Sequence, residues 1–181
     1  ETYPGAGYRG KVYCYEVFTQ DPDNAGPGEW SEFSSGEASW DTQYEGDVLP
    51  TTAAPAWQVY QGSESLASVA DGALHVNDTS NTSSIKWWRN WDATNTRGAT
   101  VLVRARCVSN DTFGSAITSF CNVSVEDGER VEEFAILTDR VRARYAAVDH
   151  PLQGDAWHTY RITTQGSQFH LYVDEEPAPA L

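Results

Sequence analysis

The stretch DAWHTYRITTQGSQFHLYVD, residues 155–174, decides the fold of this chain. It predicts two strands joined by a tight turn at residues 165–167, because polar and apolar side chains alternate on both sides of a glycine-containing break. One face of this predicted hairpin is apolar and is expected to lie on a core; it carries Tyr160, Ile162, Phe169, Leu171 and Val173. The other face carries Arg161, His170 and Tyr172, whose polar groups need water or a ligand.

Further strand patterns recur along the chain, and no segment keeps the period of about 3.6 residues that an amphipathic helix requires. The segments expected to form strands are residues 11–19, 37–43, 57–60, 73–76, 85–91, 98–108, 115–126, 131–138 and 140–146. Residues 149–155, which include His150 and Pro151, are expected to form a loop. Many short strands with turns at regular spacing predict an all-β, two-sheet antiparallel sandwich with almost no helix.

Three segments carry a family resemblance. WHTYRI (157–162), the glycine turn and LYVD (171–174) resemble the late hairpin of concanavalin A-like, or laminin G-like, jelly-roll domains. YEGDVLP (44–50) and SVADGALHV (68–76) resemble the opening of such modules in large secreted bacterial proteins. The resemblance implies a jelly-roll sandwich over residues 44–181 of an extracellular protein. This fold hosts lectins, glycosidases, polysaccharide lyases and inert spacers, so the resemblance implies no single function.

Residues 1–43 have two interpretations. The resemblance implies further strands after residues 171–174, and EASW (37–40) is similar to the closing strands of the family. The early strands would then complete the sandwich. Alternatively they are the remnant of a preceding repeat, since residues 12–31 also resemble the end of a fibronectin type III module.

The composition is strongly acidic. The chain of 181 residues has 12 Lys and Arg against 26 Asp and Glu, a formal net charge of -14. This charge argues against nucleic acid or an anionic membrane surface as a partner. No apolar run is long enough to insert across a membrane. The chain begins at Glu1 and contains no Met, which indicates a processed or excised piece.

The three cysteines allow two interpretations. Cys107 and Cys121 each lie among alternating apolar residues, and they would meet if their strands were neighbours joined by a loop at residues 110–114. They would then form a disulfide in an oxidising compartment, or else remain two small buried thiols. Cys14 would be buried or bonded to another chain. Sequons for N-glycosylation occur at Asn77, Asn81, Asn110 and Asn122.

The basic residues form the most informative pattern. Six arginines occupy outward positions of predicted strands: Arg104, Arg106, Arg140, Arg142, Arg144 and Arg161. Because a guanidinium grips carboxylate or sulfate with two parallel hydrogen bonds, they are candidates for a groove that binds acidic polysaccharide. The remaining candidate ligand contacts are His170, Tyr172 and Trp88. In the alternative interpretation the arginines pair across strands with Glu126, Glu132 and Glu133, or are split between two sheets.

The tryptophans between residues 85 and 91 are expected on both faces of the predicted strand, because successive side chains alternate. Trp87 and Trp91 share a face with Ile85 and are expected in the core, whereas Trp88 lies on the other face. Trp88 is therefore the better candidate for stacking on a sugar ring.

The sequence contains no complete catalytic or zinc-binding motif. Glu126 is expected in a turn and Glu132 and Glu133 are adjacent, so no carboxylate pair shares a cleft as a retaining glycosidase requires. A lyase would need a base and a carboxylate-binding group, and Tyr172, His170, Arg161 and Arg142 are the candidates if they converge.

No His or Cys group has zinc spacing. Asp21, Asp23 and Asn24 are candidates for a calcium loop, although such residues also make ordinary turns.

These observations predict a secreted, non-catalytic carbohydrate-binding or adhesion module whose partner is a polysaccharide or another glycan. One alternative is a structural repeat of an extracellular filament or surface assembly, with copies of itself or neighbouring modules as partners. The other is a polysaccharide lyase or glycoside hydrolase.

Overall fold

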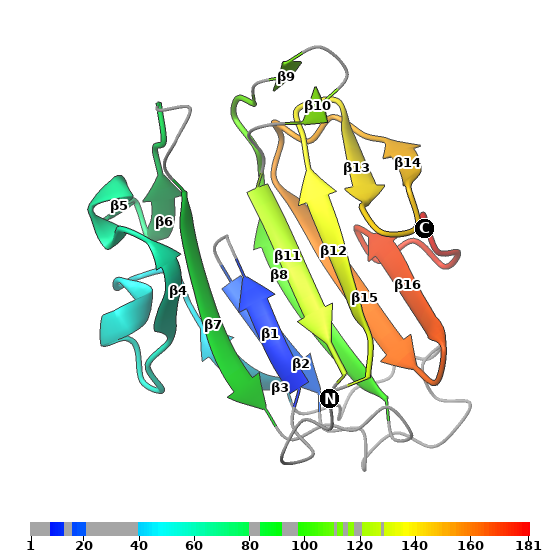
Figure 1. The fold of residues 1–181 in the computed structure, drawn as a ribbon, viewed down its shortest axis with the longest axis horizontal. Helices are drawn as coiled ribbons and strands as arrows, with labels where there is room; N and C mark the ends of the chain where they lie inside the picture. The colour runs from blue at the N-terminus through cyan, green and yellow to red at the C-terminus, as the bar shows by residue number, and fades with distance from the viewer. Residues whose placement is uncertain are drawn as a thin grey trace.

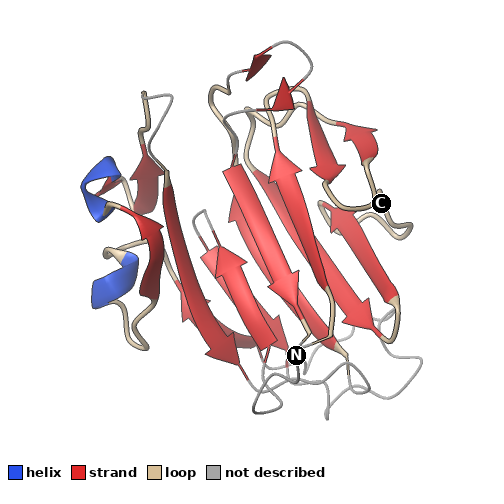
Figure 2. Ribbon diagram, viewed as in Figure 1, coloured by secondary structure: helices blue, strands red, loops and turns tan. Residues whose placement is uncertain are grey.

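The chain forms an antiparallel β-sandwich with almost no helix (Figures 1 and 2). The computed structural model describes residues 8–12, 16–20, 40–79, 84–91, 98–110, 112–113, 116–117, 121–127 and 129–181. Within these ranges the helical segments are two short 3₁₀ turns, η3 (Pro50–Thr52) and η4 (Glu64–Leu66). The all-β prediction is confirmed.

Two sheets make up the sandwich, and the smaller one lies behind the larger one in Figure 1. The larger sheet has seven strands in the order β14 (Val148–Pro151), β13 (Arg140–Ala143), β12 (Val131–Ile136), β11 (Cys121–Glu126), β1 (Tyr8–Val12), β7 (Ile85–Trp91) and β4 (Gln58–Gly62). The smaller sheet has five strands in the order β16 (Gln168–Val173), β15 (His158–Gln165), β8 (Ala99–Ala105), β2 (Glu16–Gln20) and β3 (Trp40–Tyr44). Two ribbons pair β5 (Ala67–Ala70) with β6 (Ala73–Val76) and β9 (Thr112–Phe113) with β10 (Ala116–Ile117).

The core lies between the two sheets. The hairpin β15–β16 contributes the inward residues Tyr160, Ile162, Leu171 and Val173, all of which are buried as predicted, and Phe169 packs against them. The larger sheet contributes Val123, Val125, Phe134, Ile136 and Val141 from the facing side. Fully burying one such side chain contributes about 1.5–3 kcal/mol, so this layer fixes which face of each strand points outward.

Two segments differ from their predicted structure. Residues 11–19 were expected to form one strand, but β1 ends at Val12 and β2 begins at Glu16, and the two strands lie in different sheets. A chain that crosses between sheets changes which face is inward, which explains why this segment lacked a clean alternation. The loop expected at residues 149–155 was also wrong, because Val148–Pro151 is the edge strand β14. Pro151 has no N–H, and a sheet tolerates it at an edge.

The early strands belong to the same two sheets as the rest of the chain. β1 lies between β11 and β7 in the larger sheet, whereas β2 lies between β8 and β3 in the smaller one. Of the two interpretations of residues 1–43, these pairings correspond to early strands that complete the sandwich.

Candidate functional site

The six outward arginines are divided between the two outer faces of the sandwich. Arg104 on β8 stands opposite Thr159 of β15, and both lie on the face of the smaller sheet that points away from the core. Arg142 on β13 stands opposite Ala135 of β12 on the outer face of the larger sheet. The whole core separates these faces. The predicted single groove, with Arg142 and Arg161 in one site, is therefore wrong.

On the outer face of the smaller sheet, two arginines stack on one indole. The guanidinium carbon of Arg104 lies 4.8 Å from the centroid of the Trp157 ring, and that of Arg106 lies 5.0 Å from it. The geometry follows from the register: β8 and β15 pair up to Ala105 and His158, and Arg106 and Trp157 continue the two strands by one residue. We call these three residues the Arg–Trp–Arg cluster. Among the carboxylates whose side chains the structure describes, which do not include that of Glu16, none makes an ion pair with either arginine.

Arg161 lies further along the same face, and it is engaged within the protein. Its Nε lies 2.9 Å from Oε2 of Glu175, and its guanidinium carbon lies 3.8 Å from the centroid of the Tyr172 ring. The residue is buried. His170, half-buried, stands opposite Thr163 on this face. Five of the eight candidate ligand residues thus share the smaller sheet: Arg104, Arg106, Arg161, His170 and Tyr172.

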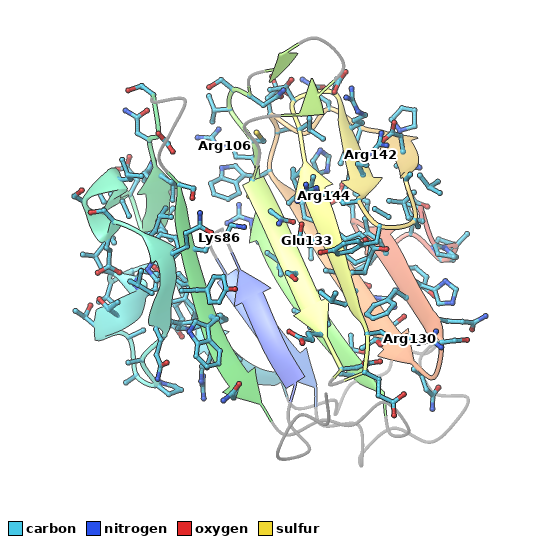
Figure 3. The ribbon with its side chains drawn as sticks, viewed as in Figure 1. Lys86, Arg106, Arg130, Glu133, Arg142 and Arg144 are labelled. Atoms are coloured by element: carbon cyan, nitrogen blue, oxygen red, sulfur yellow. The ribbon has the colours of Figure 1, made fainter. Side chains whose placement is uncertain are left out.

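On the outer face of the larger sheet, the arginines have carboxylate partners. Arg142 pairs with Asp149 of the neighbouring strand at 3.0 Å, and Arg140 pairs with Asp139 at 2.9 Å. Arg144 pairs with Glu133 of β12, and Figure 3 shows both on the same side of the molecule. The alternative interpretation is therefore correct in part. The pairs of Arg142 with Asp149 and of Arg144 with Glu133 join neighbouring segments of the sheet, whereas Arg140 pairs with the residue before it, and Glu133 is the one expected carboxylate among these partners.

Glu132 has a different role from the one expected. Its carboxylate accepts hydrogen bonds from the backbone N–H groups of Glu133 and Tyr145 at 2.9 Å and of Ala146 at 3.2 Å. It therefore stabilises the turn between β13 and β14. Burial raises the pKa of Tyr145, and the charge of Glu133 raises it further.

Trp88 lies on β7 with its ring half-buried, opposite Gln58 of the edge strand β4. Its neighbour Trp87 is buried, as predicted, and donates a hydrogen bond from Nε1 to Oε1 of Glu64 at 2.9 Å. Trp88 therefore belongs to the larger sheet and not to the Arg–Trp–Arg cluster.

The predicted disulfide between Cys107 and Cys121 is wrong. Cys107 is a free, buried thiol whose Sγ lies 3.4 Å from the carbonyl oxygen of Ser109. Cys121 is disulfide-bonded. Cys107 follows β8 of the smaller sheet and Cys121 begins β11 of the larger one, so the two strands do not pair as neighbours and the basis of the prediction is removed. Burial raises the pKa of the Cys107 thiol, although hydrogen bonds with the backbone of Cys121 and Ser109 act in the opposite direction. Cys14 lies outside the described residues.

A close backbone approach at Gly154 fixes the position of Cys107. The residue donates its backbone N–H to the carbonyl of Gly154 at 2.7 Å, and the Gly154 N–H in turn reaches the carbonyl of Thr138 at 3.0 Å. A Cβ at residue 154 would lie 1.9 Å from the carbonyl oxygen of Leu137. Only glycine fits there, and it connects the end of β8 to the end of β12.

The remaining candidate site is the predicted calcium loop. The calcium candidates Asp21, Asp23 and Asn24 lie outside the described residues. Where the structure is described, no group of three or more His, Cys, Asp or Glu side chains could hold a metal ion.

Among the sequons, Asn77 is exposed and Asn122 is buried. Asn110 accepts hydrogen bonds from the N–H and the hydroxyl of Thr138, each at 2.9 Å. Asn81 lies outside the description.

Sequence reasoning missed Trp157 as a site residue. Its parity relative to Thr159 and Arg161 placed it on the outward face, next to Arg106. The alternation of side chains therefore identified the face of Trp157, but its contact with the arginines could be predicted only by knowing that β8 and β15 are neighbours.

Comparisons with models of known protein families, with curated proteins and with solved structures found no match. In the described part of the chain, no helix has the length and apolar character needed to cross a membrane. The fold and the contacts above therefore carry the functional interpretation.

Proposed function

We propose that this protein is a non-catalytic, extracellular carbohydrate-binding module that binds an acidic polysaccharide through the Arg–Trp–Arg cluster. One observation supports the proposal most strongly. In a chain with a net charge of -14, Arg104 and Arg106 stack on Trp157 and make no ion pair with any described carboxylate.

The chemistry of the cluster suits a repeating anion. A guanidinium presents several N–H donors in a planar fork, which matches the oxygens of a uronate or a sulfate group. Residues i and i+2 of a strand are separated by about 6.6 Å and point to the same side, so the two arginines could contact anionic groups along one polymer. Contact with the indole stabilises each of the two cations, of which Arg104 is exposed and Arg106 half-buried, by about 0.5–1 kcal/mol and restricts its orientation before the ligand arrives.

The jelly-roll topology is part of this proposal. The late hairpin that resembles the concanavalin A-like domains forms β15 and β16, and its apolar residues face a second sheet. Extracellular localisation rests on the same resemblance to modules of secreted proteins.

The test compares two double variants that remove the same charge from opposite faces. Arg104→Ala/Arg106→Ala is expected to weaken binding to heparin and to polyuronate by at least about tenfold, because hydrogen bonds to charged groups contribute about 1.5–3 kcal/mol each. Arg140→Ala/Arg142→Ala serves as the matched control and is expected to retain most of the affinity. Titration calorimetry in about 0.1 M and about 1 M NaCl should show strong weakening by salt for the wild type.

A further variant tests the sign of the effect. Glu16 stands opposite Arg104 in the register of β2 and β8, so Glu16→Gln should strengthen binding to the same polymers. The proposal is wrong if neither polymer binds, or if both double variants lose the same affinity.

A second candidate function is a structural repeat that associates with copies of itself through the edge strand β4. All five residues of β4 are exposed, including the large apolar side chains of Val59 and Tyr60. An exposed edge strand is a template for pairing with another chain. Sedimentation analysis distinguishes this candidate, since a monomer at high concentration would contradict it.

A further inference from the structure

Three polar residues lie side by side on the outer face of the larger sheet. Ser124 of β11 stands directly opposite Glu133 of β12, and Asn122, two residues earlier on β11, points to the same face. Inward residues such as Val123 and Phe134 alternate with them and face the core. This face is opposite to the one that carries the Arg–Trp–Arg cluster.

Two of the three side chains are buried without a partner. Ser124 is 1 % exposed and Asn122 is 2 % exposed, and in the described part of the chain neither the Ser124 hydroxyl nor Oδ1 of Asn122 has a hydrogen-bond partner. A buried polar group that makes no hydrogen bond costs about 1–3 kcal/mol of stability. Other buried polar atoms without partners occur singly, as in Thr164 and Tyr160, whereas Asn122 and Ser124 are neighbours on one face beside a carboxylate.

We infer that Asn122, Ser124 and Glu133 form the floor of a second saccharide site, which takes an uncharged sugar through its hydroxyl groups. Oδ1 of Asn122 and the carboxylate of Glu133 only accept hydrogen bonds, and the Ser124 hydroxyl both accepts and donates. Sugar hydroxyls supply the missing donors. The negative charge of Glu133 disfavours a uronate or sulfate at this position. The inference goes beyond the proposed function, because it gives the module a neutral ligand on the face opposite to its acidic one.

Two further side chains border this floor. Arg144 pairs with Glu133, and their side chains are 40 % and 11 % exposed, so turning the guanidinium into solvent costs more than breaking a surface ion pair unless a ligand replaces it. Its departure frees the Glu133 carboxylate to accept from a ligand hydroxyl. Trp88 lies on β7, two strands from β11 and hence about 10 Å away, where a further sugar ring of the same chain could stack on the indole. Figure 3 shows Glu133, Arg144 and Lys86 on this side of the molecule.

The test uses three neutral probes, cellohexaose, xylohexaose and mannohexaose, and titration calorimetry in about 1 M NaCl, where the attraction of anions to the Arg–Trp–Arg cluster is screened. At least one probe is expected to bind. Ser124→Ala should weaken that binding by about five- to tenfold, the effect of one lost hydrogen bond. Glu133→Gln should weaken it by about tenfold or more, because a charged acceptor contributes more.

A control variant separates a binding role from a structural one. Thr164→Val also removes a buried hydroxyl that has no partner, but in the smaller sheet. Both Ser124→Ala and Thr164→Val should leave the denaturation midpoint unchanged or raise it, and only Ser124→Ala should weaken the sugar. The inference is overturned if no probe binds, or if Ser124→Ala binds as tightly as the wild type. Arg104→Ala/Arg106→Ala should keep the neutral binding, so failure of the acidic site remains distinguishable from failure of this one.

Discussion

The two outer faces of the sandwich each carry arginines, yet they differ in what the arginines contact. On the larger sheet, Arg140, Arg142 and Arg144 all lie beside carboxylates. On the smaller sheet, Arg161 pairs with Glu175, but Arg104 and Arg106 lie against an indole. The difference teaches that arginines remain available to a ligand where they outnumber the carboxylates at neighbouring positions.

The register explains the difference. On the larger sheet, Asp149 stands directly opposite Arg142, and Glu133 lies beside Arg144 where the pairing of β12 with β13 continues by one residue. On the smaller sheet, the residue of β15 opposite Arg104 is Thr159, which carries no charge, and the residue of β2 opposite it is Glu16. Arg104 and Arg106 together carry more positive charge than this one carboxylate can balance, and a diffusing polyanion can meet the excess.

The largest expected effect concerns the ion pair between Arg161 and Glu175 on the smaller sheet. The side chain of Arg161 is 7 % exposed and that of Glu175 is 44 % exposed. Glu175→Ala should lower the free energy of unfolding by about 2 kcal/mol, because it leaves a buried cation without this carboxylate. Chemical denaturation measures the change.

The matched variant on the larger sheet is Asp149→Ala. The side chains of Arg142 and Asp149 are 30 % and 42 % exposed, so solvent screens the pair and its loss should cost at most about 1 kcal/mol. Equal destabilisation by the two variants would contradict the distinction between a structural arginine on one face and surface pairs on the other.

Much of this comparison could be predicted from the sequence, but not the pairing of strands. Alternation in residues 155–174 was sufficient to place Tyr160 and Leu171 inside and Arg161 outside, since the period of a strand fixes its faces. Alternation cannot say which sheet a strand joins. Arg142 and Arg161 have the same pattern and lie on opposite sides of the molecule.

The same limit explains the error at the cysteines. Cys107 and Cys121 both follow the parity of buried residues, and a short connection between them favoured neighbouring strands. The chain instead crosses from the smaller sheet to the larger one between β8 and β11. Such a crossing depends on contacts between distant segments, for example the approach of Gly154 to Leu137 and Cys107, which no local pattern reports.

A smaller effect is expected from the indole of the Arg–Trp–Arg cluster. Trp157→Ala should weaken heparin binding by about two- to fivefold, because each exposed cation–π contact contributes about 0.5–1 kcal/mol. Trp157→Phe, which keeps an aromatic face, should lose less. Calorimetry under the conditions used for Arg104→Ala/Arg106→Ala gives the comparison. Loss of all binding in both Trp157 variants would show that the ring contacts the polymer itself.

The smallest expected effect reports the sign of the charge on the larger sheet. Burial raises the pKa of Tyr145, the Glu133 charge raises it further, and the Arg144 charge lowers it. Glu133→Gln should therefore lower the pKa of Tyr145, and Arg144→Gln should raise it. The absorbance of tyrosinate during an alkaline titration measures both, with Tyr145→Phe to assign the signal. Shifts of opposite sign in the two variants would show that the charges of both Glu133 and Arg144 act on Tyr145. An unchanged Tyr145 pKa in Glu133→Gln would contradict this assignment. The expected pair of shifts also separates the faces: a carboxylate dominates the charge around Tyr145, whereas two cations dominate around Trp157.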